Sequence, residues 1–318
     1  MSENILDYPI ELPHADISPY AAGNTGVPYV TTYDSGEPGL HVLIMAVTHG
    51  NELCGAIALD HLFKNNVQPI KGKLTLAFSN IAAYESFDPE NPLASRFVEE
   101  DMNRTWGLDV LDGDRDTIET RRARELRPIV DQADVLLDLH SMQTMATPLM
   151  ICGALEKGQE FARAIGTPEY IVSDAGHKEG TRMRDYGGFG DPASSKNALL
   201  LEAGQHWEKA AGGIAIDCTL RFLKHHGTIP ADFLMEDQLP LPGMQKMIKV
   251  THPITIQSDD FRFAQPYLGF ECIEKEGTIL GWDGDQEVLT PYDNCYLIMP
   301  SRRLKAGKTA VRLGRLID

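Results

Sequence analysis

Two apolar runs that each lead to a histidine constrain the fold of this chain more than any other feature. Residues 42–47 come shortly before His49-Gly50-Asn51-Glu52, and residues 134–140 end at His140. Short, nearly continuous apolar runs are typical of parallel strands that are buried on both faces. The carboxyl ends of such strands meet at one edge of an open α/β sheet, where ligands gather. We therefore expect His49 and His140 to lie close together.

The side chains at these two strand ends are of the kind that binds zinc. Catalytic zinc sites often take two histidines and one glutamate from the protein and leave a fourth position open for water. We predict that His49, Glu52 and His140 bind one Zn²⁺ per chain. A lone His-x-x-Glu pair also fits a helix start with a surface histidine, but the second strand-end histidine favours a metal site.

A third apolar run, residues 197–201, ends at Glu202. A glutamate at the end of a buried strand is poorly solvated, which raises its pKa, whereas a nearby zinc ion lowers it. In either state Glu202 is placed to accept a proton from water and to pass it to a leaving group. Without a metal site at His49, Glu52 and His140, which we call the metal group, Glu202 would be better interpreted as a helix N-cap or a salt-bridge partner at the sheet edge.

The segment from Arg96 to Arg104 forms the fourth feature. It lies in a polar stretch that contains prolines, which predicts a loop or a short helix. An arginine offers a fixed fork of donors to a carboxylate or to a developing oxyanion, and Asn103 can also donate to a carboxylate. The alternative is that these are ordinary solvated charges of a loop.

Taken together, these motifs resemble the succinylglutamate desuccinylase/aspartoacylase family, which belongs to the zinc carboxypeptidase clan. The resemblance spans roughly residues 40–205 and rests on four short motifs in the family's order. They are His49-Gly50-Asn51-Glu52, Asp101-Met102-Asn103-Arg104, Asp138-Leu139-His140 and Glu202-Ala203-Gly204.

The resemblance implies a role for each matching residue. His49, Glu52 and His140 match the zinc ligands, and Glu202 matches the general base. Arg96 matches the arginine that polarises the scissile carbonyl, and Asn103 and Arg104 match residues that contact the substrate. Separately, because Asp138 lies close to His140 in the sequence, we expect it to support the site through a metal-bound histidine. The resemblance also implies a homodimer.

The chain departs from the aspartoacylases at one position. Those enzymes carry a further arginine, shortly before the catalytic glutamate, that binds the side-chain carboxylate of the substrate, but here the region reads Asp191-Pro192-Ala193. This puts N-acetylaspartate in doubt as the substrate. Arg182 and Arg184 lie further upstream and are candidates for substrate binding from a loop. The late active-site tyrosine of those enzymes has three candidates here, Tyr267, Tyr292 and Tyr296.

Alternation of apolar strands and amphipathic helices predicts an α/β sheet covered on both faces. The resemblance implies that it is a zinc-carboxypeptidase-like mixed sheet flanked by helices. Helices are expected at 53–63, 116–133, 158–165 and 210–226, and strands at 29–33, 41–47, 73–79, 134–140, 148–152, 170–173 and 197–201. The first two strands are expected to form a hairpin at the sheet edge. After a linker at 230–245, strands are expected at 249–256, 270–274, 278–281, 287–290, 295–299 and 309–313. We predict a catalytic domain at 1–235 and a small all-β domain at 246–318.

Composition limits the possible partners and the compartment. The net charge of −17 and the absence of a basic run argue against nucleic acid and against an anionic membrane surface. The N-terminus lacks a basic region followed by an apolar core, so no secretory signal is predicted, and no run approaches the ~20 apolar residues of a membrane span. Five widely spaced cysteines fit a reducing cytoplasm better than a disulfide framework.

Two further histidines and a glycine run complete the candidates. His177 is expected at the surface, and His206, four residues after Glu202, is a weaker candidate for the pocket. Residues 187–190 lack the strand–glycine–helix context of a phosphate loop and predict a flexible loop.

From these features the chain is predicted to be a zinc-dependent hydrolase that cleaves the amide bond of a small N-acyl amino acid or related N-acyl amine. Two alternatives stay open. One is a metallocarboxypeptidase that trims peptides, and the other is a non-catalytic relative that binds a small molecule or a partner protein.

Overall fold

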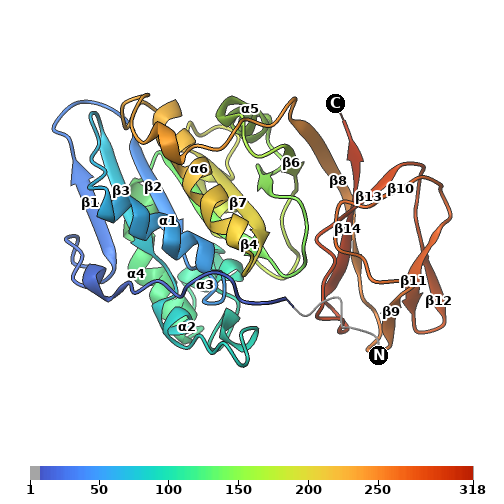
Figure 1. Ribbon diagram of the computed structural model, residues 1–318. Helices are drawn as coiled ribbons and strands as arrows, with labels where there is room; N and C mark the ends of the chain where they lie inside the picture. The colour runs from blue at the N-terminus through green and yellow to red at the C-terminus, as the bar shows by residue number, and fades with distance from the viewer. Residues whose placement is uncertain (1–7, 318) are drawn as a thin grey trace.

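The computed structural model describes residues 8–317 and is built on one large mixed sheet (Figure 1). The sheet has 11 strands in the order β1-β3-β2-β4-β7-β5-β6-β8-β14-β13-β10, and a second sheet has the order β12-β11-β9. The strands are β1 (Val30–Asp34), β2 (His41–Ala46), β3 (Lys73–Phe78), β4 (Val135–Met142), β5 (Leu149–Ile151), β6 (Tyr170–Ser173), β7 (Asn197–Gln205), β8 (Lys246–Thr255), β9 (Phe261–Phe263), β10 (Cys272–Ile273), β11 (Ile279–Asp283), β12 (Gln286–Leu289), β13 (Cys295–Ile298) and β14 (Thr309–Leu316).

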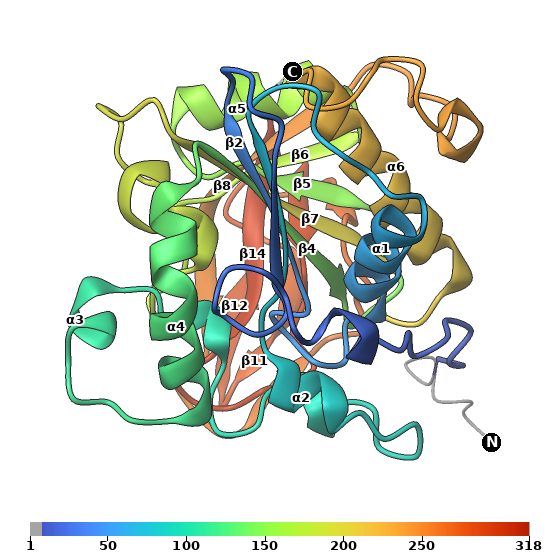
Figure 2. The same cartoon turned by 90° about the vertical axis from the view of Figure 1, so that its left-hand side faces the viewer.

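Helices cover both faces of the part of this sheet that precedes β8 in the chain (Figure 2). They are α1 (Leu53–Lys64), α2 (Ile81–Glu85), α3 (Leu108–Leu111), α4 (Ile118–Gln132), α5 (Glu156–Ile165) and α6 (Lys209–His225). Alternate residues of β2 face opposite layers: Ile44 belongs to the core cluster that contains residues of α1 and α6, and Met45 to the one that contains residues of α4. Burial on both faces explains why β2 and β4 read as continuous apolar runs.

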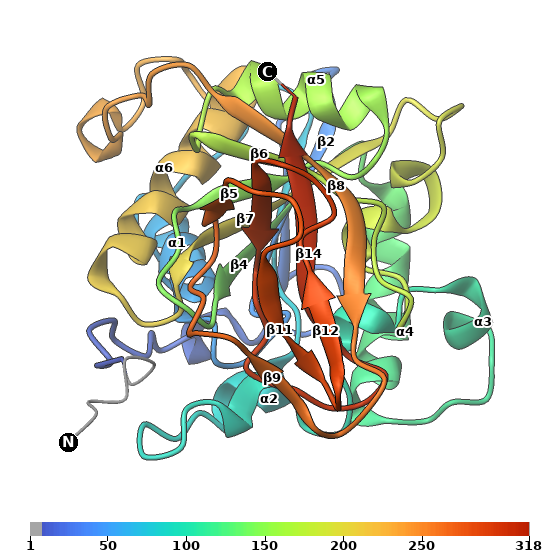
Figure 3. The ribbon, with the colours of Figure 1, turned by 90° about the vertical axis from the view of Figure 1, so that its right-hand side faces the viewer.

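The last third of the chain continues the same sheet. Strand β8 pairs in parallel with β6 and antiparallel with β14, so that the C-terminal strands extend the sheet beyond β6 (Figure 3). The predicted fold class, a mixed sheet flanked by helices with all-β structure at the C-terminus, is confirmed. The division into domains at 1–235 and 246–318 stays a prediction. None of the helices between residues 8 and 317 is both long and apolar enough to cross a membrane. Residues 1–7, on which the secretory-signal prediction rests, lie outside the described residues.

The predicted hairpin of the first two strands is wrong. Strand β1 pairs antiparallel with β3, with Val30 opposite Ala77, and β2 lies between β3 and β4. Side-chain burial accounts for this order. Residues 42–46 of β2 are buried, which suits a central strand of a sheet covered on both faces, whereas the partly exposed β1 suits an edge. The short strand β9 was also not predicted.

A glycine in the His49–Glu52 turn is required by close backbone contact. A Cβ on Gly50 would lie 2.2 Å from the carbonyl of Ala83 and 2.5 Å from the carbonyl oxygen of Ser95. We therefore expect Gly50→Ala to lower the free energy of unfolding by about 3 kcal/mol, because the backbone atoms on both sides cannot yield. Urea unfolding measures this loss.

Gly213 on α6 provides the matched control. A Cβ added to this residue would have nothing within 4 Å, and the residue is exposed on the helix. Gly213→Ala should raise the free energy of unfolding by about 0.5–1 kcal/mol, because alanine loses less backbone entropy in a helix. A Gly50→Ala protein as stable as the wild type would contradict the tight packing of this turn.

Candidate active site

Three buried side chains from two strand ends converge at the carboxyl edge of the sheet. His49 and Glu52 lie in the turn between β2 and α1, and His140 lies on β4. Both imidazoles direct Nδ1 at the same carboxylate: His49 Nδ1 lies 2.7 Å from Glu52 Oε1, and His140 Nδ1 lies 2.9 Å from Glu52 Oε2. One donor atom from each residue lies within 4.8 Å of the others. The predicted grouping is therefore present in the structure.

The opposite nitrogen of each imidazole is next to a carboxylate. His49 Nε2 lies 2.9 Å from Asp101 Oδ1, and His140 Nε2 lies 2.9 Å from Asp138 Oδ2. Thr48 in turn donates to Asp138 over 3.1 Å. Histidines that bind metals usually donate their second N–H to such a carboxylate, which orients the ring. The donor set and its outer carboxylates thus fit a zinc ion bound through the two Nδ1 atoms and Glu52.

The charge on Glu52 is stabilised by its neighbours. Burial by itself would raise the pKa of this carboxyl, but the adjacent His49 and His140 outweigh it and hold the pKa well below its usual range. The backbone N–H of Ser141 also donates to Glu52 Oε2 over 3.1 Å. Glu52 is therefore anionic, as a metal ligand must be.

Glu202 lies on the strand next to His140. The two residues are direct partners in the parallel pairing of β4 with β7, so their side chains project from the same face of the sheet. Burial and then the nearby Glu52 raise the pKa of Glu202 to about 8, although His140 and Arg96 oppose the shift. Its buried Oε2 has no hydrogen-bond partner within residues 8–317. Such a carboxyl group can both accept and release a proton near neutral pH.

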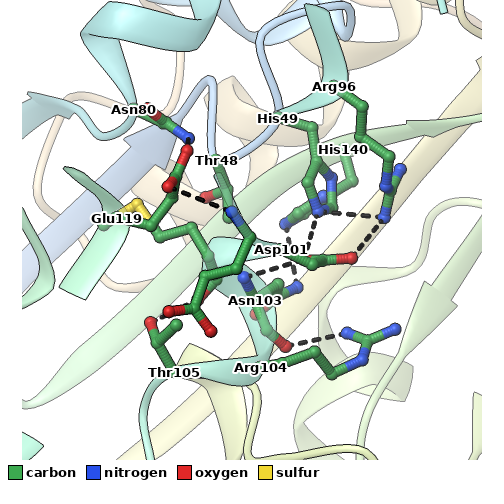
Figure 4. A network of polar contacts seen from close by, with 12 residues as sticks. Thr48, His49, Asn80, Arg96, Asp101, Asn103, Arg104, Thr105, Glu119 and His140 are labelled. Atoms are coloured by element: carbon green, nitrogen blue, oxygen red, sulfur yellow. Dashed lines mark hydrogen bonds and ion pairs between the residues drawn. The ribbon is translucent and has the colours of Figure 1, made fainter. Parts of the chain in front are cut away.

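Arg96 joins the candidate metal ligands to the following loop. It ends a short 3₁₀ helix, Ala94–Arg96, and its guanidinium lies 3.2 Å from Glu52 Oε1. It also lies 3.1 Å from Asp101 Oδ2 (Figure 4). The backbone N–H of Gly50 donates to the carbonyl of Arg96 over 3.2 Å, which ties the two segments together. Arg96 thereby holds a positive charge beside the metal group.

A buried carboxylate from α4 holds the backbone between Arg96 and Asp101. Glu119 accepts hydrogen bonds from the backbone N–H groups of Val98, Glu99 and Glu100 over 2.7, 3.2 and 3.2 Å. Asn80 donates to the same carboxylate over 3.2 Å, and Figure 4 shows Asn80 and Glu119 next to each other, apart from His49 and Arg96. Sequence reasoning missed Glu119. Its only signal is an acidic residue in the first turn of a helix, where such residues are common.

Asn103 and Arg104 lie in the next 3₁₀ helix, Met102–Arg104. Asn103 is buried and accepts from the backbone N–H of Met183 over 3.0 Å, and its Nδ2 lies 3.5 Å from His140 Nε2. Arg104 donates to the carbonyl of Asn103 over 2.8 Å, while its buried Nε has no partner among the described residues. Both residues border the same cavity as the metal group.

The two arginines of the upstream loop have different surroundings. Arg182 is buried in the cavity wall and forms ion pairs with Asp174 and Asp185. Arg184 is not among the residues that line the cavity, and it donates to the backbone carbonyls of Cys152 and Ala198 over 3.0 and 2.8 Å. The position of Arg184 indicates a structural brace, so its predicted part in substrate binding has no support from the geometry.

The cavity has a volume of about 450 Å³, and both parts of the chain contribute to it. Besides the residues above, side chains from the C-terminal part line it: Ile298, Met299, Pro300, Ser301, Arg303, Lys308, Thr309 and Arg312. Sequence reasoning named none of these residues. The available signal was Arg312, a charge within the largely apolar predicted strand at 309–313.

The remaining candidates have mixed outcomes. His206 is fully buried and lines the cavity, as the weaker candidate was expected to do. Its Nδ1 lies 2.8 Å from Ser141 Oγ, and burial lowers its pKa to about 3. His177, expected at the surface, is partly exposed, and its ring lies against Arg312 in the cavity wall. In the described part of the chain, none of the three candidate tyrosines, Tyr267, Tyr292 and Tyr296, lines the cavity.

Comparison with known proteins identifies a matching family profile and a related enzyme. The profile of the succinylglutamate desuccinylase/aspartoacylase catalytic domain matches residues 38–219. Aspartoacylase of Rattus norvegicus is 29% identical over 116 residues, which cover 33% of this chain and only 35% of that protein. The match therefore spans about a third of the length of this relative.

Solved structures show the same fold at low sequence identity. A succinylglutamate desuccinylase from Vibrio cholerae has a TM-score of 0.66 at 17% identity, covering 91% of this chain and 86% of that one. The product-bound ectoine utilization protein of Ruegeria pomeroyi has a TM-score of 0.62 at 16% identity, with 92% of each chain covered. Because the family profile covers more than half of the sequence, the chain belongs to the succinylglutamate desuccinylase/aspartoacylase family.

Proposed function

We propose that this protein is a zinc-dependent hydrolase that cleaves the amide bond of a small N-acyl amino acid or a related N-acyl amine. One observation carries the proposal: His49, Glu52 and His140 bring three donor atoms within 4.8 Å of one another, and Glu202 lies on the adjacent strand with an unpartnered carboxyl oxygen among the described residues. The family's catalytic domain and the similarity to an aspartoacylase support an N-acyl amino acid as the substrate class.

The chemistry divides between the metal and the chain. Zinc, when bound by His49, Glu52 and His140, supplies a Lewis acid that polarises a carbonyl and lowers the pKa of water. Glu202 removes the proton from the attacking water and then protonates the leaving amine. Arg96 stabilises the negative charge that develops on the carbonyl oxygen, because preorganised positive charge acts most strongly in a buried site. Asn103 and Arg104 orient the substrate.

The size of the cavity favours this function over peptide trimming. A volume of about 450 Å³ is in the range that holds a small molecule. In this proposal residues 1–235 carry the catalytic group, and residues 246–318 close one side of the cavity.

An amine-release assay tests the proposed function. Purified zinc-loaded protein would be incubated with N-acetyl and N-succinyl amino acids, and, in parallel, with short peptides that have a free C-terminus. Release from at least one N-acyl amino acid, stopped by a chelator and restored by zinc, is the expected result. Cleavage of peptides alone would favour a metallocarboxypeptidase, and no release from protein shown to hold zinc would favour a binding role.

Glu119 is expected to affect this activity without touching the substrate. Glu119→Gln places an amide N–H₂ where backbone N–H groups now donate, so the loop with Arg96 and Asp101 should shift. We expect kcat/KM to fall about 10- to 100-fold on the best substrate, because small misplacements of catalytic groups cost that much. The midpoint of thermal unfolding should also fall.

Glu125 on the same helix supplies the control. Its side chain is 56% exposed and pairs with Arg122 at the surface, so Glu125→Gln should leave kcat/KM and thermal unfolding near the wild-type values. An active Glu119→Gln protein with unchanged kcat/KM would show that the loop keeps its position without this carboxylate.

A further inference from the structure

The catalytic cavity contains a buried imidazole that the proposed mechanism does not use. His206 follows β7, is 0% exposed and borders the cavity. Its Nδ1 lies 2.8 Å from Ser141 Oγ, whereas its buried Nε2 has no hydrogen-bond partner between residues 8 and 317. The equally unpartnered Oε2 of Glu202 therefore does not accept from it. A buried polar atom without a partner costs free energy, which a ligand can recover.

The ring is held in a fixed position close to the metal group. The backbone N–H of His206 donates to the carbonyl of Met142 over 2.8 Å. Ser141, which contacts the ring through its hydroxyl, donates its backbone N–H to Glu52 Oε2 over 3.1 Å. One residue thus joins the imidazole to a candidate metal ligand. A side chain held in this way is preorganised to bind a ligand.

The contact with Ser141 assigns the proton of the ring. The Ser141 hydroxyl has two neighbours that can accept its hydrogen: an imidazole nitrogen, which is a good acceptor, and the sulfur of Cys54, which is a weak one. We therefore assign the hydroxyl as the donor to Nδ1, which leaves the proton of the neutral ring on Nε2. Burial lowers the pKa of His206 to about 3, so the ring is neutral. His206 thus offers one N–H donor to the cavity.

This donor lies in a different part of the cavity from the residues assigned to the amino acid half of the substrate. The charges that act most on His206 are those of Glu52, Arg96, His49 and His140. The charges that act most on His177 are those of Arg312, Arg104, Arg182 and Asp101. The two sets share no member. Because Asn103 and Arg104 are assigned to the amino acid half, His206 faces the acyl half.

Neighbouring donors at this end of the cavity are already engaged. Thr144, which also lines the cavity, donates its hydroxyl to the carbonyl of Leu268 over 2.6 Å. Arg96 is paired with Glu52 and Asp101. An alkyl chain in the acyl half would leave the Nε2–H buried and unpaired, whereas an oxygen atom on that chain would accept from it. Sites with a buried donor discriminate strongly against ligands that lack the matching acceptor.

We propose that His206 binds the acyl half of the substrate through its Nε2–H, and that the acyl group carries an oxygen acceptor beyond the scissile carbonyl, as a hydroxyacyl or oxoacyl group does. The inference rests on the proposed hydrolase function and adds a specificity-determining residue to it. A plain alkanoyl group such as acetyl would leave the donor without its partner.

Isothermal titration of zinc-loaded protein with monocarboxylates tests the inference. Each acid stands in for the acid that hydrolysis releases, with its carboxylate in place of the cleaved carbonyl. Two pairs differ only in a terminal hydroxyl or methyl group: 3-hydroxypropanoate with butanoate, and 4-hydroxybutanoate with pentanoate. We expect the hydroxy acid of at least one pair to bind roughly tenfold more tightly, because the alkyl acid leaves a buried donor unpaired. These acids contain no amide bond, so a protein that fails the amine-release assay can still pass this test.

Substitution of His206 decides whether it is the donor. His206→Phe keeps a ring of similar size without an N–H, so the two acids of a pair should bind with nearly equal affinity while the zinc content stays that of the wild type. His206→Gln returns an amide N–H and should restore part of the preference. His252→Phe is the matched control: His252 is exposed on β8 and is not among the residues that line the cavity, so the preference should be unchanged.

Nitrogen-15 NMR of histidine-labelled protein reads the same contact in the wild type. The signal of His206, identified by its loss in His206→Gln, should show a proton on Nε2 that exchanges slowly with solvent. It should move when the preferred hydroxy acid binds and stay nearly in place when the matching alkyl acid binds. This measurement decides the question even if His206→Phe does not fold.

Three results would overturn the inference. Equal binding within both pairs by the wild type would show that the Nε2–H does not meet the acyl group. A preference that persists in His206→Phe would place its origin elsewhere, for example in chelation of zinc by the hydroxyl. A ring proton found on Nδ1 would remove the donor itself.

Discussion

Replacement of Glu202 by glutamine is expected to lower kcat about 10²- to 10⁴-fold on the best substrate of the amine-release assay. Glutamine has nearly the same size but cannot accept a proton from water or deliver one to the leaving amine, and general acid–base catalysis contributes that range. Burial and the nearby Glu52 raise the pKa of Glu202 to about 8, which suits this carboxyl for both transfers. Steady-state kinetics at saturating substrate measures the loss.

Zinc content separates this effect from damage to the metal group. Because Glu202 is not among the three grouped ligands, Glu202→Gln should retain the zinc of the wild type. Glu160→Gln, at an exposed position on α5, should leave both zinc content and kcat unchanged. A Glu202→Gln protein that holds zinc and turns over at the wild-type rate would remove Glu202 from the proposed mechanism.

Replacement of His140 by alanine is expected to abolish both zinc binding and turnover. The variant keeps only His49 and Glu52 of the three grouped ligands, whereas catalytic zinc sites use three. The charge of Glu52 would also lose one of the two histidines that offset its burial. Metal analysis after dialysis against a weak chelator should find zinc in the wild type and almost none in the variant.

A milder substitution at the carboxylate next to His140 should give a partial loss of zinc affinity. Asp138→Asn keeps His140 but replaces the carboxylate 2.9 Å from its Nε2, so zinc affinity should fall roughly 10- to 100-fold rather than disappear. His225→Ala, at the exposed end of α6, should behave as the wild type. Full zinc retention by His140→Ala would place the metal elsewhere.

The arrangement of the metal group follows from sequence order because parallel strands align their ends. The apolar runs before His49, His140 and Glu202 identify three strands buried on both faces, and the carboxyl ends of such strands meet at one edge. The local pattern therefore implied a long-range contact. The structure places these residues together, with Glu202 directly opposite His140.

Pairing partners of the outer strands were decided only by the tertiary structure. A hairpin between β1 and β2 satisfies the turn residues between them equally well, but β2 lies between β3 and β4. Its central position depends on the helices that cover both faces of the sheet and cannot be inferred from the turn. In the same way β8, far along the chain, extends the sheet at β6.

The roles of the arginines depended most on the fold. Arg182, Arg184 and Arg312 are alike in sequence, each a charge in a mixed segment. The structure directs Arg184 to backbone carbonyls and places Arg182 and Arg312 around Asp174 in the cavity wall. An arginine side chain is long and can pair with any carboxylate or carbonyl within reach, so its partner is set by which strands and loops meet. Sequence by itself thus determined the grouping of His49, Glu52 and His140, because strand ends dictate their positions, and the tertiary structure alone decided which cations border the cavity.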